Sequence, residues 1–546
     1  TILEREDVIA GYSDLKNGTD TITAVAAVLP LFFILIVVLM TSNTMVRMIE
    51  EERSEIGALT SLGFRDTEIL RGYLIYVLSA TVLGVVTGYF IGCTVIPYII
   101  AKCFPYLLPP LILKFDAFFF FLILLVAVVL MAGVTVLFCK GELKQKPAVL
   151  LRPAPPQKGQ KILLENFGLL WNHLSFTWKV TLRNIFRYKR RVFMTIIGIA
   201  GCTALLLTGF GVKDCLNGVA EAQYGDIFRY DQMIVLKDDT AEIGPDLAAL
   251  LAQGGAEDPA LLKQTAVTCV SKEKSLQCYL IVPGDEAAFL QYYHLTAESG
   301  GANLHLSDQG VIVTAKIAEI YGVGPGDTLE IQDGDGGTYG LPVAAVAENY
   351  IGSYIYLNQG LYQDIFGEAA TYNMIVSAAA ENFSASKLLN DEAIVNVTAS
   401  DTILKQALQS SDSLNGVVLL IVVVASLLAV IVLYNLTSIN ISERKREIAT
   451  LKVLGFYDWE TNAYIYREAF LLALLSIVIG LFLGIGLHRF LMSAIEQDAV
   501  IYFDTVKALS YLWAFLITLV ASVLMQVITY FKLKKIDMIE SLKSVE

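Results

Sequence analysis

The residue types that most often perform catalysis are sparse and scattered in this sequence. The four histidines, His173, His294, His305 and His488, lie far apart, and a lone histidine is more often structural than a metal ligand. The sequence contains no G-x-x-x-x-G-K-[ST] phosphate loop, no H-E-x-x-H zinc motif and no C-x-x-C redox motif. We therefore expect no catalytic residue, no metal site and no cofactor in this chain.

One glycine-rich stretch, Asp333 to Gly340 (DGDGGTYG), combines glycines and aspartates as calcium-binding loops do. It lacks the regular D-x-[DN]-x-[DN]-G spacing and the distant glutamate that complete such a loop. A hairpin turn is the better interpretation.

Two charged stretches indicate a different chemistry, the docking of a protein partner. Asn43 to Phe64 (NTMVRMIEEERSEIGALTSLGF) and Asn435 to Phe456 (NLTSINISERKREIATLKVLGF) align at a shift of 392 residues, with nine of twenty-two positions identical. Each stretch follows an apolar run, is rich in charged residues and ends with Leu-Gly-Phe. Because glycine commonly ends helices, each stretch predicts a charged helical stalk that stops at a corner, at Gly63 or at Gly455.

The repeat extends beyond the corners. Asp66, Glu68, Gly88 and Gly92 recur in the same register as Asp458, Glu460, Gly480 and Gly484. Repeats this far apart are two copies of a large module rather than a solenoid. In a single corner the charges would equally suit a solvated helix end, but their recurrence in both copies favours binding of a partner.

The composition is that of a membrane protein. The chain has 546 residues, of which 55% are hydrophobic and only 17% charged. Runs of about 18 or more uncharged, mostly apolar residues predict spanning helices. Seven such runs are present: Thr21 to Val46, Tyr73 to Ala101, Ala117 to Cys139, Val192 to Val212, Ser413 to Ser442, Ala469 to Leu487 and Ala508 to Phe531.

Seven spans divide unequally between two copies, with three in the first and four in the second. The missing span would precede residue 1, which is Thr1 rather than a methionine. We expect this chain to be the C-terminal part of a longer protein with at least eight spans. Because no ionisable residue stands at the centre of a predicted span, an ion-coupled transporter is disfavoured.

The distribution of basic residues predicts the orientation. Segments 43–72, 140–191, 439–467 and 532–546 carry 25 of the 40 Lys and Arg residues and should face the cytoplasm. The insert 213–413 carries nine Lys and Arg against 28 Asp and Glu and should lie outside the cell. The net charge of −13 argues against nucleic-acid binding, which needs a basic face.

The insert is long enough to be a domain, and it alternates apolar strands with helical stretches. QMIVLK, CYLIV, GVIVT, DTLEI and SYIYL read as strands, Ala315 to Tyr321 reads as a helix, and Gly324, Gly326 and Asp327 form a turn. The predicted fold is an α-helical multi-pass membrane protein with an α+β extracellular domain.

Smaller features carry further expectations. Gly84, Gly88 and Gly92, and Gly480 and Gly484 in the second copy, are spaced for close helix packing. Five cysteines lie in or beside spans as small apolar residues, whereas Cys269 and Cys278 would face each other across a hairpin turning at Glu273 and Lys274 and could form a disulfide. A short helix after Gly63, from Arg65 to about Arg71, should precede the second span.

The long inside segment 140–191 begins with a proline-rich linker. Trp171, Leu174, Trp178, Leu182 and Ile185 then recur at helical spacing, with basic residues toward the end. Such a helix would lie in the inner membrane interface, although packing on protein is the alternative.

The paired corners resemble the FtsX-like permeases of MacB-type (type VII) ABC systems. The resemblance rests on Glu51 to Phe64 and Glu443 to Phe456, on the basic elbow Thr177 to Ile199, and on the inside ends Pro147 to Arg152 and Met538 to Lys543. The stretch Val311 to Ile331 is similar to the extracellular domain of such permeases. MacB itself carries a fused ATPase domain, and none is attached here.

The resemblance implies a division of the chain. Residues 1–20 would end a first extracellular domain, 21–152 would form the first permease unit, and 153–191 the linker and interfacial helix. Residues 192–212 would be the first span of the second unit, 213–413 its MacB-like extracellular domain, and 414–546 its remaining spans and tail.

The resemblance also implies a mechanism. A separate ABC ATPase dimer, which would hold the ATP and Mg²⁺, would bind the corners in a cell membrane, and its closure would move the stalks and the extracellular domains. The implied contacts are Glu51, Arg53, Glu55, Leu59, Leu62, Gly63 and Phe64 in one copy and Glu443, Lys445, Glu447, Leu451, Leu454, Gly455 and Phe456 in the other.

Two functions follow from this mechanism. The first is export or extraction of an amphiphile such as a lipid, lipoprotein or antimicrobial peptide. The second is non-transporting signalling or scaffolding that controls an extracellular partner such as a cell-wall hydrolase. An intramembrane enzyme is disfavoured because the polar constellations that it needs are missing.

Overall fold

The computed structural model describes residues 10–103, 112–143, 151, 176–187, 189–270, 275–298, 301–334, 336–455, 457–495, 500–503 and 505–534. Contacts divide the chain into two compact units. The membrane unit comprises Thr1–Val212, Ser413–Ala494 and Val506–Glu546, and the α+β domain comprises Lys213–Asp412 with Ile495–Thr505.

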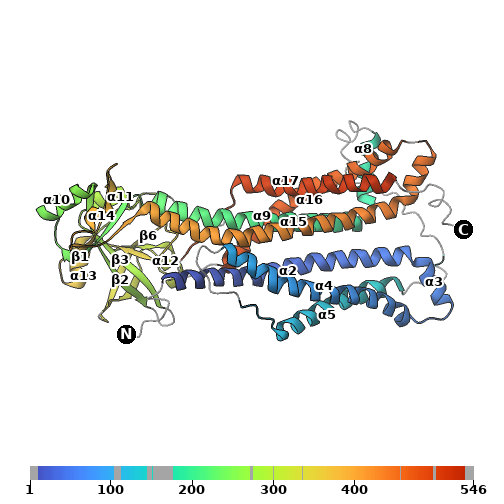
Figure 1. The fold of residues 1–546 in the computed structure, drawn as a ribbon, viewed down its shortest axis with the longest axis horizontal. Helices are drawn as coiled ribbons and strands as arrows, with labels where there is room; N and C mark the ends of the chain where they lie inside the picture. The colour runs from blue at the N-terminus through green and yellow to red at the C-terminus, as the bar shows by residue number, and fades with distance from the viewer. Residues whose placement is uncertain are drawn as a thin grey trace. The chain divides into compact units, whose positions relative to one another are not determined.

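Seven helices in the described part of the chain are long and apolar enough to cross a membrane, which confirms the seven predicted spans (Figure 1). The first copy contributes three and the second copy four. They are α2 (Ala10–Glu51), α4 (Asp66–Cys103), α5 (Ala117–Leu143), α9 (Lys189–Glu221), α15 (Ser400–Val453), α16 (Asp458–Ile495) and α17 (Ala508–Lys534).

The predicted separate helix from Arg65 to about Arg71 is wrong. These residues are the N-cap and first turns of α4, which runs without a break through Gly72 into the apolar run at Tyr73, because a single glycine inside a helical pattern is tolerated. Of the predicted interfacial helix, α8 (Phe176–Arg187) is helical, and Trp171 and Leu174 lie outside the described residues.

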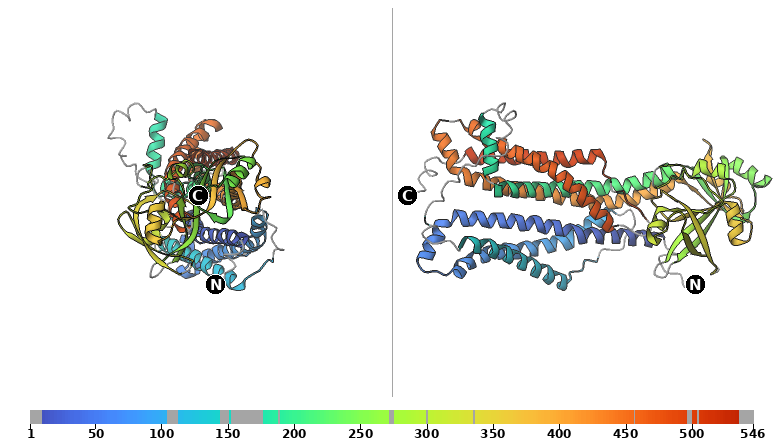
Figure 2. Two further views of the ribbon diagram at one scale, coloured as in Figure 1. Left: turned by 90° about the vertical axis from the view of Figure 1, so that its left-hand side faces the viewer. Right: turned by 180° about the vertical axis from the view of Figure 1, so that it is seen from behind.

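Each copy has its own packing in the membrane unit. The first copy gathers Ile49, Ile56, Ile69 and Leu70 of α2, α3 (Arg53–Ser61) and α4 around Cys139 of α5. The second copy joins α9, α15, α16 and α17 around a buried cluster of Ile199, Leu433, Ala473, Ile477, Ala521 and Met525. Both Figure 1 and Figure 2 show α9 and α15 side by side.

The α+β domain is built on one nine-stranded mixed sheet of order β3-β7-β4-β6-β5-β2-β8-β1-β9. Only the β3–β7 and β4–β6 pairs are parallel among the pairs described. The strands are β1 (Gln232–Thr240), β2 (Ala256–Val270), β3 (Ser275–Pro283), β4 (Val311–Thr314), β5 (Thr328–Gln332), β6 (Thr338–Ala347), β7 (Tyr354–Tyr356), β8 (Tyr372–Ala379) and β9 (Ile394–Ala399).

Five helices complete the domain: α10 (Pro245–Gly254), α11 (Glu286–Tyr292), α12 (Ala315–Tyr321), α13 (Gln359–Phe366) and α14 (Ala385–Leu388). The helix α12 has the predicted bounds, and the five predicted strands lie in β1, β3, β4, β5 and β7. The predicted α+β class is therefore confirmed.

The glycine-rich stretch forms the predicted hairpin turn, between β5 and β6. Gln332 pairs with Thr338 at the end of the ladder. The Asp333 amide donates to the Gly337 carbonyl over 3.0 Å, and the Gly337 amide donates to Asp333 Oδ1 over 2.7 Å. The aspartate thus serves the turn itself.

The predicted facing of the two outer cysteines is wrong by two residues. Across the β2–β3 hairpin Cys269 faces Leu276, and Cys278 faces Val267. Both cysteines are buried free thiols. The hydrogen bond between them, together with burial, raises the pKa of Cys269 far above its usual range.

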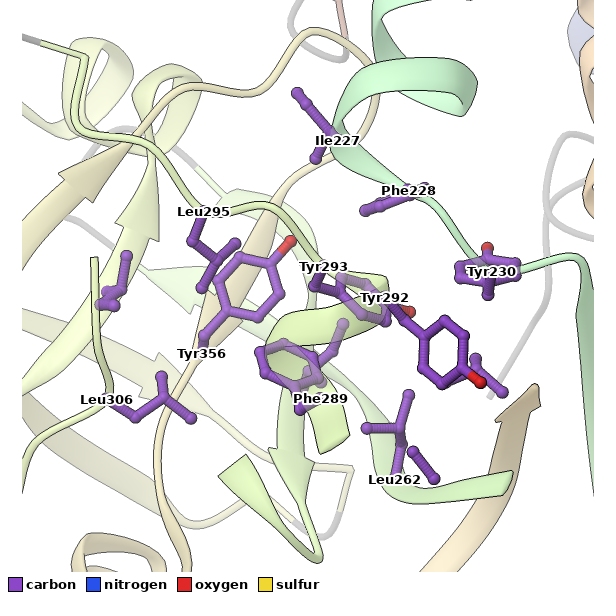
Figure 3. Packing of buried hydrophobic residues seen from close by; sticks show 14 of the residues in the cluster. Ile227, Phe228, Tyr230, Leu262, Phe289, Tyr292, Tyr293, Leu295, Leu306 and Tyr356 are labelled. Carbon is purple, nitrogen blue, oxygen red and sulfur yellow. The ribbon is translucent and has the colours of Figure 1, made fainter. Parts of the chain in front are cut away.

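Aromatic side chains fill one core of the domain (Figure 3). Phe289 stacks on Tyr293 at a centroid distance of 4.5 Å, and Phe228 meets Tyr293 edge-on at 5.0 Å. Tyr356 packs against both Phe289 and Tyr293. Because burial disfavours the phenolate, the pKa values of Tyr293 and Tyr356 lie well above the usual value.

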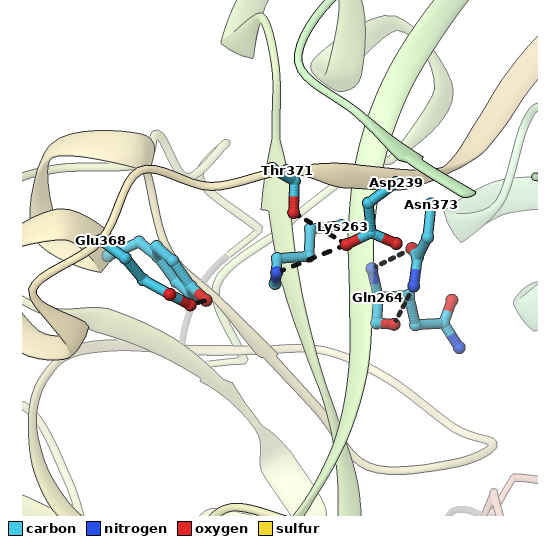
Figure 4. Close-up of polar contacts among 7 residues, drawn as sticks. Asp239, Lys263, Gln264, Glu368, Thr371 and Asn373 are labelled. Carbon is cyan, nitrogen blue, oxygen red and sulfur yellow. Dashed lines mark hydrogen bonds and ion pairs between the residues drawn. The ribbon is translucent and has the colours of Figure 1, made fainter.

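A polar cluster ties β1, β2 and β8 together near one end of the sheet (Figure 4). The Asn373 side chain extends the ladder like a peptide unit, because its Oδ1 accepts from the Gln264 amide and its Nδ2 donates to the Gln264 carbonyl. Asp239 accepts a hydrogen bond from Thr371 Oγ1 over 2.7 Å and forms an ion pair with Lys263.

Candidate coupling corners

The first corner has the complete hydrogen-bond pattern of a Schellman motif. Helix α3 ends at Ser61, and the Gly63 amide donates to the Thr60 carbonyl over 3.1 Å. The Phe64 amide reaches back to the Leu59 carbonyl over 3.2 Å. This pair of bonds satisfies the last carbonyls of the helix and reverses the chain within three residues.

Both corner glycines adopt the left-handed conformation that the sequence predicts. The φ angle is +95° at Gly63 and +92° at Gly455. A Cβ added at either position would meet no described atom within 4 Å. The requirement for glycine at both corners is therefore backbone conformation and not space.

The stalk of the first copy is interrupted just before its corner. Helix α2 ends at Glu51, and α3 begins at Arg53 after a break at Glu52. Tyr73 Oη donates to Glu52 Oε2 over 2.7 Å, which fixes the break against α4. Beyond the corner the Arg65 amide donates to Glu68 Oε2 over 2.8 Å, so Glu68 caps the start of α4.

A pocket of about 410 Å³ opens inside the first corner. Its walls are apolar, from Met48, Ile56, Leu59, Phe64, Ile69, Gly72 and Tyr73, and its only charged lining residues are Glu52, Glu55 and Glu68. No lysine or arginine lines it in the described structure. The pocket therefore suits an apolar side chain accompanied by a basic group.

The second corner repeats the turn without the break. Helix α15 continues to Val453, and the Leu454 amide donates to the Thr450 carbonyl over 3.0 Å. The helical backbone includes Glu443, Lys445, Glu447 and Leu451, but their side chains, and Phe456 as a whole, lie outside the described residues.

One leucine stands exposed at the same register in both corners. Leu62 is 77% exposed and Leu454 is 70% exposed. Leu59, by contrast, packs on the cluster beneath the first corner. Large apolar side chains that protrude in matched positions are typical of a protein-binding surface.

The predicted glycine packing is present in one copy only. A Cβ at Gly480 would lie 2.7 Å from the Ala200 carbonyl oxygen, and one at Gly484 would lie 2.9 Å from a Leu207 methyl group. A Cβ added at Gly84, Gly88 or Gly92 would have no described atom within 4 Å. The first-copy glycines therefore do not pack on the described helices.

A second site, a polar junction, lies at the end of α9, and the hydropathy of the sequence did not predict it. There a π-helical turn, η2 (Ala222–Ile227), follows α9 and carries the fully buried Gln223. Gln223 Nε2 donates to Asn349 Oδ1 over 2.9 Å, and its Oε1 accepts from the amides of Tyr350 and Ile351. A glutamine among apolar residues was the only available sequence signal.

The loop of residues 349–351 also binds the connection between α16 and α17. The Ile501 amide donates to the Tyr350 carbonyl over 2.8 Å, and the rings of Tyr350 and Phe503 lie 4.5 Å apart. Phe503 in turn lies beside Gly218 of α9. Residues 349–351 thus clamp the outer ends of two helical segments within the α+β domain.

His488 lies within the described span of α16 and is fully buried there. Its ring is close to Gly211, where an added Cβ would lie 2.8 Å from Nδ1. This histidine therefore belongs to the packed interior of the second copy. No cluster of metal-ligating side chains is found among the residues that the structure describes.

The family model described as FtsX-like permease C-terminal matches residues 27–141 and 419–538. A search of curated protein sequences gives no match to the chain. The solved structures that resemble part of the chain include the following two.

The first is the extracellular domain of the noncanonic ABC-type transporter YknZ from Gram-positive bacteria, with 16% identity, 31% of this chain and 100% of that chain covered, and a TM-score of 0.21. The second is the periplasmic region of MacB from Actinobacillus actinomycetemcomitans, with 14% identity, 34% and 94% covered, and a TM-score of 0.23.

Proposed function

Because residues 27–141 and 419–538 are two FtsX-like permease units in one chain, we propose that the protein is an ABC transporter subunit that transmits ATP-driven motion to its extracellular domain. The observation that carries the proposal is the pair of matched corners. Each holds an exposed leucine beside a left-handed glycine, at the end of a charged stalk that follows a spanning helix. A surface repeated in this way suits a partner that is itself a dimer.

The partner that fits is a separate ABC ATPase dimer, which would supply ATP and Mg²⁺. The amino-acid sequence contains no phosphate-binding loop of its own. Leu62 and Leu454 would seat in the two ATPase subunits, and Glu55 with its repeat Glu447 would pair with basic groups there. Glu51, Arg53 and Phe64, with Glu443, Lys445 and Phe456, would complete the contact.

The path of motion is supported by helix continuity. Helix α15 begins directly after β9 and ends at the second corner, so one helix of 54 residues joins the sheet to the docking point. At 1.5 Å per residue it is about 80 Å long. A displacement of the corner would pass along this helix toward the extracellular domain.

The proposed cargo is an amphiphile, such as a lipid, a lipoprotein or an antimicrobial peptide. The described spans expose large apolar side chains and have no charged residue at their centres, which suits movement driven from outside the bilayer rather than an ion path. Control of an extracellular protein, such as a cell-wall hydrolase, by the same motion is the alternative outcome.

The test begins with the exposed leucines. Leu62→Asp with Leu454→Asp should abolish co-purification of the ATPase and its stimulated hydrolysis in lipid nanodiscs, while the protein keeps its melting temperature. Leu389→Asp is the matched control, because Leu389 is an exposed leucine of the α+β domain, 47% exposed. Undiminished ATPase binding by the double variant would disprove docking at the corners.

The same nanodiscs distinguish the two outcomes. ATP hydrolysis is measured with candidate amphiphiles and, separately, with candidate cell-wall hydrolases. Stimulation by an amphiphile supports transport, whereas a response to the hydrolase alone supports signalling.

A further inference from the structure

A cavity of about 40 Å³ lies in the second copy, between α9, α15, α16 and α17. Part of its wall is apolar and belongs to the buried cluster of that copy, through Ile199, Leu433 and Ala473. The wall also includes four polar side chains: Thr195 of α9, Thr437 of α15, and Ser522 and Gln526 of α17. Polar groups therefore gather at one place among helices whose shared core is apolar.

The hydroxyl group of Ser522 distinguishes this cavity from a simple packing gap. Ser522 is 3% exposed, and its Oγ has no hydrogen-bond partner among the described residues. Other buried hydroxyls of the same helix are satisfied within it. Thr518 Oγ1 donates to the Ala514 carbonyl over 3.0 Å. Thr529 Oγ1 donates to the Met525 carbonyl over 2.7 Å. Because a buried hydroxyl without a partner is costly, we expect Ser522 to bind a group that the chain itself does not supply.

Water fits this cavity in size and in chemistry. One water molecule needs about 10–15 Å³ of such space, so the cavity has room for more than one. A buried water also needs two to four polar partners, and Thr195, Thr437 and Gln526 stand with Ser522 on the wall. Cavities that stay dry are lined by apolar groups alone.

The first copy fills the equivalent space with larger side chains. The repeat of 392 residues places Met45 in register with Thr437, and Val77 in register with Ala469, which also lines the cavity. Met45 and Val77 are both buried, and they form one cluster with Met131. Smaller side chains at both positions leave the cavity open in the second copy.

We propose that the cavity is a binding site for ordered water, which hydrogen-bonds to Ser522 and bridges α17 to α9 and α15 through Thr195 and Thr437. Thr195 lies in the first turn of its span and Thr437 in the last turn of its span, so water enters from the end of the helices that leads to the second corner. A water bridge is nearly as favourable in enthalpy as a direct hydrogen bond. The water thus takes the place of the side-chain packing that closes the same contact in the first copy.

The test is X-ray radiolytic footprinting with mass spectrometry on the protein in nanodiscs. Radiolysis splits bound as well as bulk water, so a buried side chain is oxidised where a water molecule lies beside it. Leu433 and Leu472 line the cavity and are 6% and 4% exposed. Both should be oxidised, whereas Ile421 on α15 and Leu487 on α16, which are equally buried and lie outside the cavity wall, should stay protected. Equal protection of all four side chains would overturn the proposal.

Filling the cavity should remove the water. The double variant Thr437→Leu, Ala469→Val copies the volume of the first copy, with leucine in place of methionine because methionine itself reacts with hydroxyl radicals. Oxidation of Leu433 and Leu472 should be lost in this variant. Val424→Leu, at an exposed position of α15 outside the cavity wall, is the matched control and should leave the oxidation unchanged. Oxidation that persists in the filled variant would show that the water lies elsewhere.

The smaller change Ser522→Ala tests the site without added volume, and so remains informative if the double variant does not fold. Loss of the hydroxyl should lower the oxidation of both leucines relative to the wild-type protein. Unchanged oxidation in Ser522→Ala would overturn the assignment of Ser522 as the group that binds the water.

Discussion

Replacing Gln223 with leucine should open the junction at the outer end of α9 and leave the rest of the fold intact. The leucine side chain keeps similar volume but removes one donor and one acceptor. Three groups lose their partner: Asn349 Oδ1 and the amides of Tyr350 and Ile351. They are enclosed, because Gln223 is fully buried and Asn349 is 3% exposed.

The magnitude follows from the orphaned groups. Each buried polar group without a partner costs about 1–3 kcal/mol, and water entering the opened loop recovers part of this. A net loss of about 3 kcal/mol in the stability of the closed loop is therefore expected, which corresponds to about a hundredfold increase in opening. Ile501 should follow, because its amide is held by the Tyr350 carbonyl.

The assay is hydrogen–deuterium exchange with mass spectrometry on the protein in nanodiscs. Peptides that contain Tyr350, Ile351 and Ile501 should exchange about a hundredfold faster in Gln223→Leu, in proportion to the population of the open loop. Peptides from the buried strand β4 serve as the internal standard. Gln291→Leu is the matched control, because Gln291 is an exposed glutamine on α11.

Unchanged exchange at Tyr350 and Ile351, with the variant folded, would refute the reasoning. It would mean that the loop is held by its other contacts, chiefly the Tyr350–Phe503 ring contact. If exchange rises as expected, the ATPase response to the extracellular ligand should weaken in the same variant, since the clamp joins α9 to the loop.

Three further predictions concern other parts of the molecule. The double variant Gly63→Ala, Gly455→Ala should lose about 1–2 kcal/mol of stability at each corner, because alanine is strained at φ of +95° and +92°. Stimulated ATP hydrolysis should fall as well. The control variant Gly133→Ala should leave ATP hydrolysis unchanged. Burial, and after it the nearby Glu368, raise the pKa of Tyr362 to about 12. The free energy of unfolding should therefore be constant below pH 10 and fall as the pH rises from 10 through 12. Thermal melts of Tyr362→Phe should show a smaller fall over the same pH range. Cys269 and Cys278 should alkylate only after denaturation, and an oxidised peptide pair from fresh protein would contradict the free thiols.

Hydropathy and repeat register predicted the membrane part well. A span is a local property, because about 20 apolar residues in a row must be buried in lipid whatever lies around them. The corner glycines were equally readable, since the left-handed turn depends on Gly63 and Gly455 themselves. The join between stalk and span was harder, because α4 continues through the single glycine Gly72 instead of ending there.

Long-range pairing was beyond the sequence. The sheet places β2 between β5 and β8, a neighbour relation that no local pattern encodes. The cysteine register failed for the same reason, because the observed pairing of β2 with β3 is shifted by two residues from the predicted pairing. Residues 500–503 looked like part of a membrane connection, yet they pair with the loop at Tyr350 and group with the α+β domain.

The corners also show how a repeat can diverge while its backbone is kept. In register with Glu52 the second copy has Arg444, and in register with Gly72 it has Tyr464. The pocket walls of the first corner carry three carboxylates and an open glycine, whereas the matching positions of the second corner keep two carboxylates, Glu447 and Glu460, and carry an arginine and a large ring in place of the others. A symmetric ATPase dimer docked at both corners would therefore meet two surfaces of unlike charge. Its hold on the first corner should weaken more with added salt, because that corner has one more carboxylate and one fewer cation at these positions to face the basic groups of the partner.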